Sequence, residues 1–181
     1  MPESTLLHEL IHVGAERAPQ AAALTAGGRT MDYAALDADV RGVAAGLMAL
    51  GLPRGSRIGI WLDKRPETVA SSFGATAAGM VFVPLNPLLK PEQVAYILRD
   101  CDVRLLVTSP ERWPLVQPLL ASCPTLAHVV LTDGVTAAAA GPQTVTPMNW
   151  SDWVATVARP GHRVVDSDMA AILYTSGSTG K

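Results

Sequence analysis

Short, continuous apolar runs separated by helix-like segments constrain the fold of this chain more than any other feature. Runs such as RIGIWL and AHVVLT lack the every-second-residue polarity of a half-exposed strand. Strands of this kind are typical of parallel sheets whose two faces are both covered by helices. The pattern therefore predicts an open α/β fold with a mostly parallel sheet flanked by helices. The expected strands are Arg57–Leu62, Met80–Leu85, Val103–Ser109, Ala127–Thr132 and Ala170–Thr175.

Periodicity and capping signals predict the remaining elements. A pair of short strands within Ala22–Tyr33 is expected to turn at Gly27-Gly28. Asp32 has the character of an N-cap for a helix that ends at Gly51. Further helices are expected over Thr5–Arg17, over Arg65–Gly79, from Pro91 within Asn86–Asp102, and, broken by prolines, within Pro110–Ser122.

The segment 133–150 interrupts the alternation of expected strands and helices. It is low in charge and rich in Ala, Gly, Pro and Thr. We predict a surface loop there, not a domain boundary. The whole of 1–181 is then one α/β unit.

Composition excludes several classes of protein. The net charge is −2, hydrophobic residues make up 49% and no basic stripe is present, so nucleic acid is not an expected partner. The N-terminus has no signal-peptide pattern. Thr68–Leu89 is uncharged and long enough for a membrane span, but it is rich in small residues and holds Pro84 and Pro87, which predicts a buried helix running into a buried strand. Cys101 and Cys123 predict two reduced thiols in a cytoplasmic protein.

The chain ends on YTSGSTGK, a donor-rich segment that directly follows an apolar run. Gly177 and Gly180 allow anionic oxygens to approach the backbone closely. The hydroxyl groups of Thr175, Ser176, Ser178 and Thr179 add donors, and Lys181 adds a positive charge. The segment is expected to follow the carboxyl end of a last strand inside the sheet, where open α/β sheets place ligand sites.

These residues predict a polyphosphate cradle, and a Ser/Gly-rich disordered end is the structural alternative. The spacing does not fit the Walker A loop G-x-x-x-x-G-K-[ST], because Thr175 lies five residues before Gly180. It does not fit G-x-G-x-x-G either.

Tyr174–Gly180 resembles, position by position, the opening of the phosphate-loop signature [YF]-T-S-G-[ST]-T-G-x-P-K-G of the adenylate-forming enzymes. That family includes acyl-CoA synthetases, adenylation domains of peptide synthetases, and luciferases. Arg29–Trp61 and Gly74–Thr108 resemble two weaker family signatures, in the same order. The wording of Asn86–Asp102 is most similar to the bacterial acyl-CoA ligases that accompany exosortase systems.

The resemblance implies the N-terminal part of an AMP-binding domain and a two-step reaction. A carboxylic acid attacks the α-phosphate of ATP-Mg²⁺ to give an acyl-adenylate and pyrophosphate, and coenzyme A then takes the acyl group. A carrier protein as acceptor is an open alternative, and so is a non-catalytic α/β nucleotide-binding module. Thr175–Gly180 would hold the β- and γ-phosphates.

The resemblance also implies that the chain ends inside this loop. Lys181 falls on the variable x position, two residues before the lysine of the signature. The family's adenine-binding segment, magnesium-linked glutamate, ribose-binding aspartate and C-terminal lysine all come later. We therefore expect the 181-residue chain alone to be inactive.

A short histidine motif near the N-terminus also matches a known metal-binding pattern. His8-Glu9-x-x-His12 matches the H-E-x-x-H pattern of zinc proteases, but it has no evident third ligand, so ordinary histidines of an amphipathic helix are expected. The pairs Asp37/Asp39 and Asp166/Asp168 are interpreted as surface or capping residues.

Overall fold

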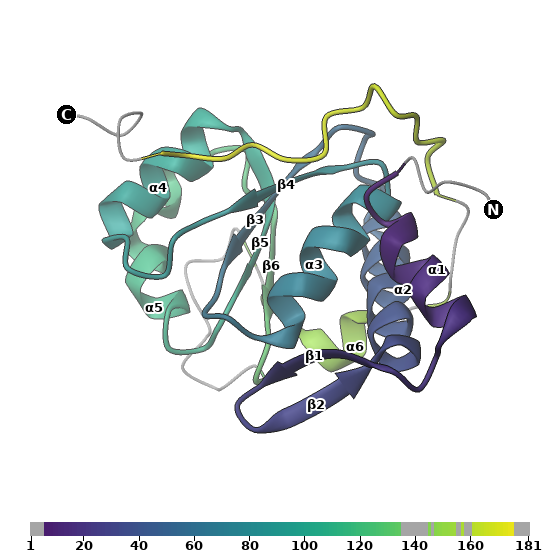
Figure 1. Ribbon diagram of the computed structural model, residues 1–181. Coiled ribbons are helices and arrows are strands. Elements are labelled where there is room, and N and C mark those ends of the chain that lie inside the picture. The colour runs from purple at the N-terminus through teal and green to yellow at the C-terminus, as the bar shows by residue number, and fades with distance from the viewer. Residues whose placement is uncertain (1–5, 135–144, 146, 155–156, 158–160, 176–181) are drawn as a thin grey trace.

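A five-stranded parallel sheet with helices on both faces forms the centre of the protein in the computed structural model, which describes residues 6–134, 145, 147–154, 157 and 161–175 (Figure 1). The strand order is β4-β3-β5-β6-β7, and each neighbouring pair is parallel. The predicted α/β architecture is confirmed. The strands are β3 (Arg57–Trp61), β4 (Val81–Pro84), β5 (Val103–Thr108), β6 (His128–Leu131) and β7 (Pro147–Asn149).

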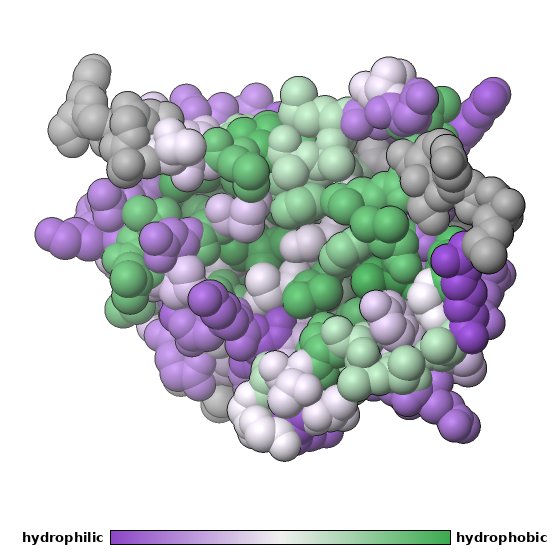
Figure 2. All heavy atoms as spheres, viewed as in Figure 1, coloured by the Kyte–Doolittle hydropathy of each residue, from purple (hydrophilic) through white to green (hydrophobic). Residues whose placement is uncertain are grey.

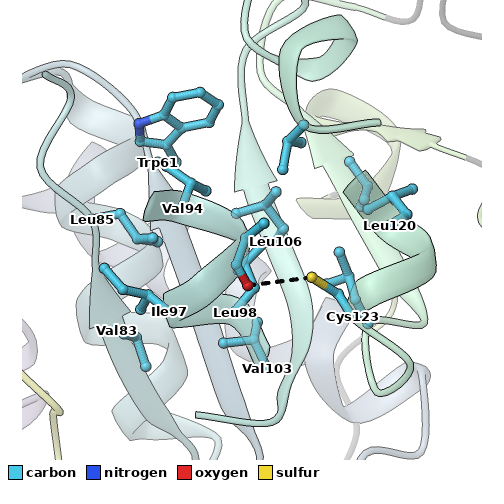
Figure 3. Packing of buried hydrophobic residues seen from close by; sticks show 14 of the residues in the cluster. Trp61, Val83, Leu85, Val94, Ile97, Leu98, Val103, Leu106, Leu120 and Cys123 are labelled. Carbon is cyan, nitrogen blue, oxygen red and sulfur yellow. Dashed lines mark hydrogen bonds between the residues drawn. The ribbon is translucent and has the colours of Figure 1, made fainter. Parts of the chain in front are cut away.

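The helices divide between the two faces of the sheet. Ile58 and Ile60 pack in one core with α2, α3 and α6, whereas Trp61 and Leu106 pack in the other with α4 and the segment after it. On the second face, Cys123 Sγ lies 3.5 Å from the carbonyl oxygen of Ala95 on α4 (Figure 3). Burial on both faces explains the continuous apolar runs. The helices are α1 (Glu9–Arg17), α2 (Tyr33–Ala49), α3 (Pro66–Ala77), α4 (Pro91–Asp100), α5 (Trp113–Val116), the 3₁₀ helix η1 (Gln117–Ser122) and α6 (Trp150–Val154).

Local signals placed several boundaries correctly. The hairpin of β1 (Ala22–Ala26) and β2 (Arg29–Asp32) turns at Gly27 and Gly28, whose φ angles of 56° and 76° fit a tight two-residue turn. Asp32 caps α2, since the backbone N–H of Ala35 donates to its Oδ1 at 2.8 Å. Pro91 opens α4, and the expected proline-broken helix is α5 followed by η1.

The prediction of a surface loop over 133–150 was wrong for its last residues. Pro147–Asn149 form β7, and Trp150 begins α6. The rings of Trp150 and Trp153 are 5.7 Å apart and both are buried, so burial of these two rings holds the segment against the sheet. Pro147 is tolerated because it is the first residue of an edge strand. Residues 135–144 and 146 lie outside the described part of the chain.

Thr68–Leu89 forms most of α3 and all of β4, as predicted. In the residues that the structure describes, no helix has both the length and the apolar character for a transmembrane span. Cys101 and Cys123 are buried and are not joined in a disulfide.

Candidate functional site

Residues 161–175 cross one edge of the sheet and lead into the donor-rich segment (Figure 1). Asp168 forms an ion pair with Arg54, and the ring Nε2 of His162 lies 3.2 Å from the carbonyl oxygen of Leu52. Ala171 makes a single parallel bridge with Phe82 of β4. The expected last strand is therefore reduced to one bridge at the sheet edge, and the prediction that it lies inside the sheet was wrong for the described residues.

The apolar character of Ala170–Thr175 did not show whether this run lies inside the sheet or at its edge. Met169 and Leu173 are 63% and 69% exposed, so only part of the run is covered by β4 and its neighbours. Among the predicted site residues, the structure describes Thr175; Ser176, Gly177, Ser178, Thr179, Gly180 and Lys181 lie outside the described residues.

Tyr174, the residue before this segment, is fixed by its hydroxyl group. The hydroxyl donates to Oδ2 of Asp100, and it lies 3.2 Å from Sγ of Cys101. The ring packs against the core on the α4 side. Burial, with these two bonds, raises the pKa of Tyr174 well above its ordinary value of 10.0.

The turn that receives this hydroxyl is itself held in place. Asp102 has a φ of 48°, a left-handed conformation that is uncommon outside glycine. Arg57 donates from Nε to the carbonyl oxygen of Cys101 and from Nη2 to that of Asp102, the latter at 3.2 Å. Charge-assisted bonds from one guanidinium to two successive carbonyls stabilise the turn.

These contacts locate the entry to the donor-rich segment. Asp100 ends α4, Val103 begins β5 and Arg57 begins β3. The Tyr174 hydroxyl therefore lies near the amino ends of β3 and β5. The carboxyl ends of β3 and β5 are occupied by other groups.

At the carboxyl ends, arginines and carboxylates pair with one another. Arg112 donates to both oxygens of Asp63, at 3.0 and 2.8 Å, and its guanidinium lies 5.6 Å from the centre of the Trp61 ring. Arg65 donates to both oxygens of Asp133, at 2.7 and 2.9 Å, and also to Glu67.

These pairs lower the pKa of Asp63, chiefly through its bonds to Arg112, and the pKa of Asp133, chiefly through its bonds to Arg65. Because both guanidinium groups are engaged by carboxylates, they do not offer a ready site for phosphate. Sequence reasoning missed this network, whose members come from three separate parts of the chain: 61–67, Arg112 and Asp133.

Comparison with known proteins identifies the family. The family model described as AMP-binding enzyme matches residues 11–181. The chain belongs to the AMP-binding enzyme family. The five-stranded sheet matches the N-terminal region of adenylate-forming enzymes of known structure.

Relatives of this AMP-binding chain include two kinds of enzyme. It is 31% identical to the AMB antimetabolite synthetase AmbB of Pseudomonas aeruginosa over 99% of its own length and 13% of that protein. It is 32% identical to a crotonobetaine/carnitine–CoA ligase of Escherichia coli over 82% of its length and 29% of that protein. The chain thus spans less than a third of either relative.

Solved structures show the same partial coverage. The anthranilate–CoA ligase AuaEII in complex with anthranoyl-AMP has a TM-score of 0.80 and 27% identity, covering 99% of this chain and 34% of that one. MbtA of Mycobacterium smegmatis has a TM-score of 0.81 and 25% identity, covering 97% and 32%.

In this AMP-binding chain the second histidine of the H-E-x-x-H motif has other partners. His12 lies 3.2 Å from Glu16 and 3.6 Å from Asp37, and it also contacts Arg41. Burial lowers the pKa of His8. Within the described ranges, no group of three or more His, Cys, Asp or Glu side chains is arranged to hold a metal ion.

Proposed function

We propose that this chain is the N-terminal portion of the AMP-binding domain of an ATP-dependent, AMP-forming acid–CoA ligase. The observation that carries the proposal is the family match over residues 11–181 together with the motif Tyr174–Gly180 at its end. The exosortase-associated type of ligase, a cytoplasmic location and a role in fatty acid metabolism are parts of the same proposal.

The reaction begins with a carboxylate oxygen of the acid substrate attacking the α-phosphorus of ATP. The bond from that phosphorus to the bridging oxygen breaks, and pyrophosphate leaves with the electron pair. Hydroxyl and backbone N–H donors of Thr175–Gly180 bind the β- and γ-phosphates, where negative charge develops. Coenzyme A thiolate then displaces AMP from the acyl carbon.

Magnesium enters this scheme with ATP and lowers the charge repulsion between the phosphates. The described residues include no group of three or more His, Cys, Asp or Glu side chains that could hold a metal ion, and we assign no magnesium ligand among them. The loop residues supply positioning and hydrogen bonds, and a later part of the polypeptide supplies the rest of the site.

Exposed apolar side chains support the idea of a longer domain. Leu88 is 89% exposed, and the exposed side chains of Met169 and Leu173 belong to the segment 161–175, which lies beside β4 at the sheet edge. Figure 2 shows apolar side chains gathered across the face that carries β4 and α3. A patch of this kind is typical of a surface that another part of a protein covers.

The experiment is acid-dependent ATP–pyrophosphate exchange, run on the 181-residue chain and on the longer enzyme that contains it. We expect exchange by the enzyme and none by the chain. Thr179→Ala or Gly180→Ala in the enzyme should slow exchange about 100-fold, with a much smaller effect on acid binding. Thr25→Ala, on the β1–β2 hairpin, is the control. Exchange by the chain alone would contradict the proposal of an incomplete site, and unchanged exchange in both loop variants would exclude the loop from the mechanism.

A carrier protein is the second candidate acceptor, because the relatives of this chain include peptide synthetases such as tyrocidine synthase 3 of Brevibacillus parabrevis. Supplying the adenylating enzyme with coenzyme A or with a holo carrier protein distinguishes the two. A thioester formed only on the carrier would replace the ligase proposal with that of an adenylation domain. Failure of exchange with every acid tested would favour the non-catalytic nucleotide-binding module.

A further inference from the structure

Tyr174 is joined to α4 by a hydroxyl contact that its apolar packing does not require. The ring already packs against the core on the α4 side, together with Ile172. A phenylalanine would keep that packing and would lose the bonds to Asp100 and Cys101. The hydroxyl therefore contributes something separate from burial of the ring.

The backbone beside the partners of the hydroxyl is held in place. Cys101 is only 8% exposed, and the carbonyls of residues 101 and 102 accept from Arg57 at the start of β3. Tyr174, by contrast, belongs to a segment with one bridge to the sheet, in which the N–H of Ile172 donates to the carbonyl oxygen of Phe82 at 3.1 Å. The hydroxyl adds a second attachment point two residues further on.

We propose that Tyr174 is a positioning residue whose hydroxyl, held by Asp100 and Cys101, fixes where the donor-rich segment 175–180 begins. The proposal rests on the proposed function for its catalytic consequence, but the attachment itself does not. Thr175 is the first donor of the segment and follows Tyr174 directly. Fixing the residue before it limits the positions its backbone and hydroxyl can take, which is what binding a phosphate in a single geometry requires.

The attachment is tested on the 181-residue chain by amide hydrogen exchange. Tyr174→Phe should raise the exchange rate of the Ile172 amide about fivefold, because one hydrogen bond that opposes local opening is lost. Asp100→Asn should act in the same direction. The amide of Val107, in the buried strand β5, should stay unchanged and so exclude global destabilisation.

Tyr96→Phe is the matched control, since it makes the same chemical change on the exposed face of α4. It should leave the Ile172 amide at the wild-type rate. An equal rate in wild type and Tyr174→Phe would overturn the attachment, and so would an increase of the same size in Tyr96→Phe.

The positioning role is tested on the longer enzyme. Tyr174→Phe should lower kcat for ATP–pyrophosphate exchange about fivefold while leaving the KM of the acid and the Tm unchanged. The double variant Tyr174→Phe/Asp100→Asn should be no slower than the slower of the two single variants, because both substitutions remove the same hydrogen bond. Unchanged kcat in Tyr174→Phe would overturn the positioning role. If the wild-type enzyme shows no exchange, the proposed function fails together with the positioning role, whereas the exchange of the Ile172 amide still decides the attachment.

Discussion

Gly74 allows α2 and α3 to pack closely, and Gly74→Ala should separate them. A Cβ atom at position 74 would lie 2.5 Å from Cβ of Val43 and 2.9 Å from the carbonyl oxygen of Val40. Both atoms belong to α2. Val43 is fully buried, so its side chain has no free space to enter, and the carbonyl moves only if the helix moves.

Two opposing effects decide the size of the change. Alanine is the better helix former, by up to about 1 kcal/mol. Overpacking of a close-packed core costs about 1–3 kcal/mol, and the upper end applies because one of the clashing atoms is backbone. We expect a net loss of about 2 kcal/mol, which for a chain of this length lowers Tm by about 4–8 °C.

Thermal and urea unfolding of the 181-residue chain provide the assay. Val43→Ala should relieve the side-chain part of the clash, so Gly74→Ala should cost less in that background than in the wild type. Gly51→Ala is the control for backbone strain alone, because that position has a φ of +67° and nothing within 4 Å of the added atom. A Gly74→Ala protein as stable as wild type, or more stable, would refute the reasoning, since helix propensity would then outweigh the contact.

Two further outcomes are expected. Burial, and then the charge of Glu67, raise the pKa of Asp39 above its ordinary value of 3.8; folding therefore favours the protonated form, and stability falls as the pH rises through the raised pKa. Asp39→Asn should accordingly raise stability at pH 7 and leave it unchanged at pH 3, and the gain should be only a few tenths of a kcal/mol because the site is half exposed. Thermal unfolding at both values of pH tests this. A gain of equal size at pH 3 would contradict it. Zinc titrated into the wild type and into His8→Ala should give the same weak calorimetric signal, and a stoichiometric site lost in the variant would show that the H-E-x-x-H residues bind metal after all.

Local patterns were sufficient to predict most of the sheet and its connections. Residues 58–61 of β3 are buried on both faces, so none of them is polar or charged, and this alone separates the run from a half-exposed strand. Gly27-Gly28 and Asp32 act within a few residues of themselves, through positive φ angles and a cap bond. Such features depend on no distant partner, so the sequence displays them directly.

Strand β7 shows where local patterns were insufficient. Three residues with a leading proline give no periodicity to detect. The segment pairs with β6 because α6 follows it and buries the rings of Trp150 and Trp153 against α2, where Gly46 leaves room for the Trp153 ring. That contact joins residues more than a hundred positions apart, and only the assembled core reveals it.

The motif of the candidate site can be recognised from local sequence, whereas its position in the fold depends on residues far away in the chain. The anion site at Thr175–Gly180 is predicted from residue types alone, because hydroxyl groups, glycines and the lack of acids favour binding of an anion. The hydroxyl of Tyr174 instead bonds to Asp100, 74 residues earlier. The family signature accepts tyrosine or phenylalanine at this position, so the motif is complete without that bond. In this chain the tyrosine pairs with a carboxylate at the end of α4, and the comparison of Tyr174→Phe with Tyr96→Phe measures the effect of that pairing.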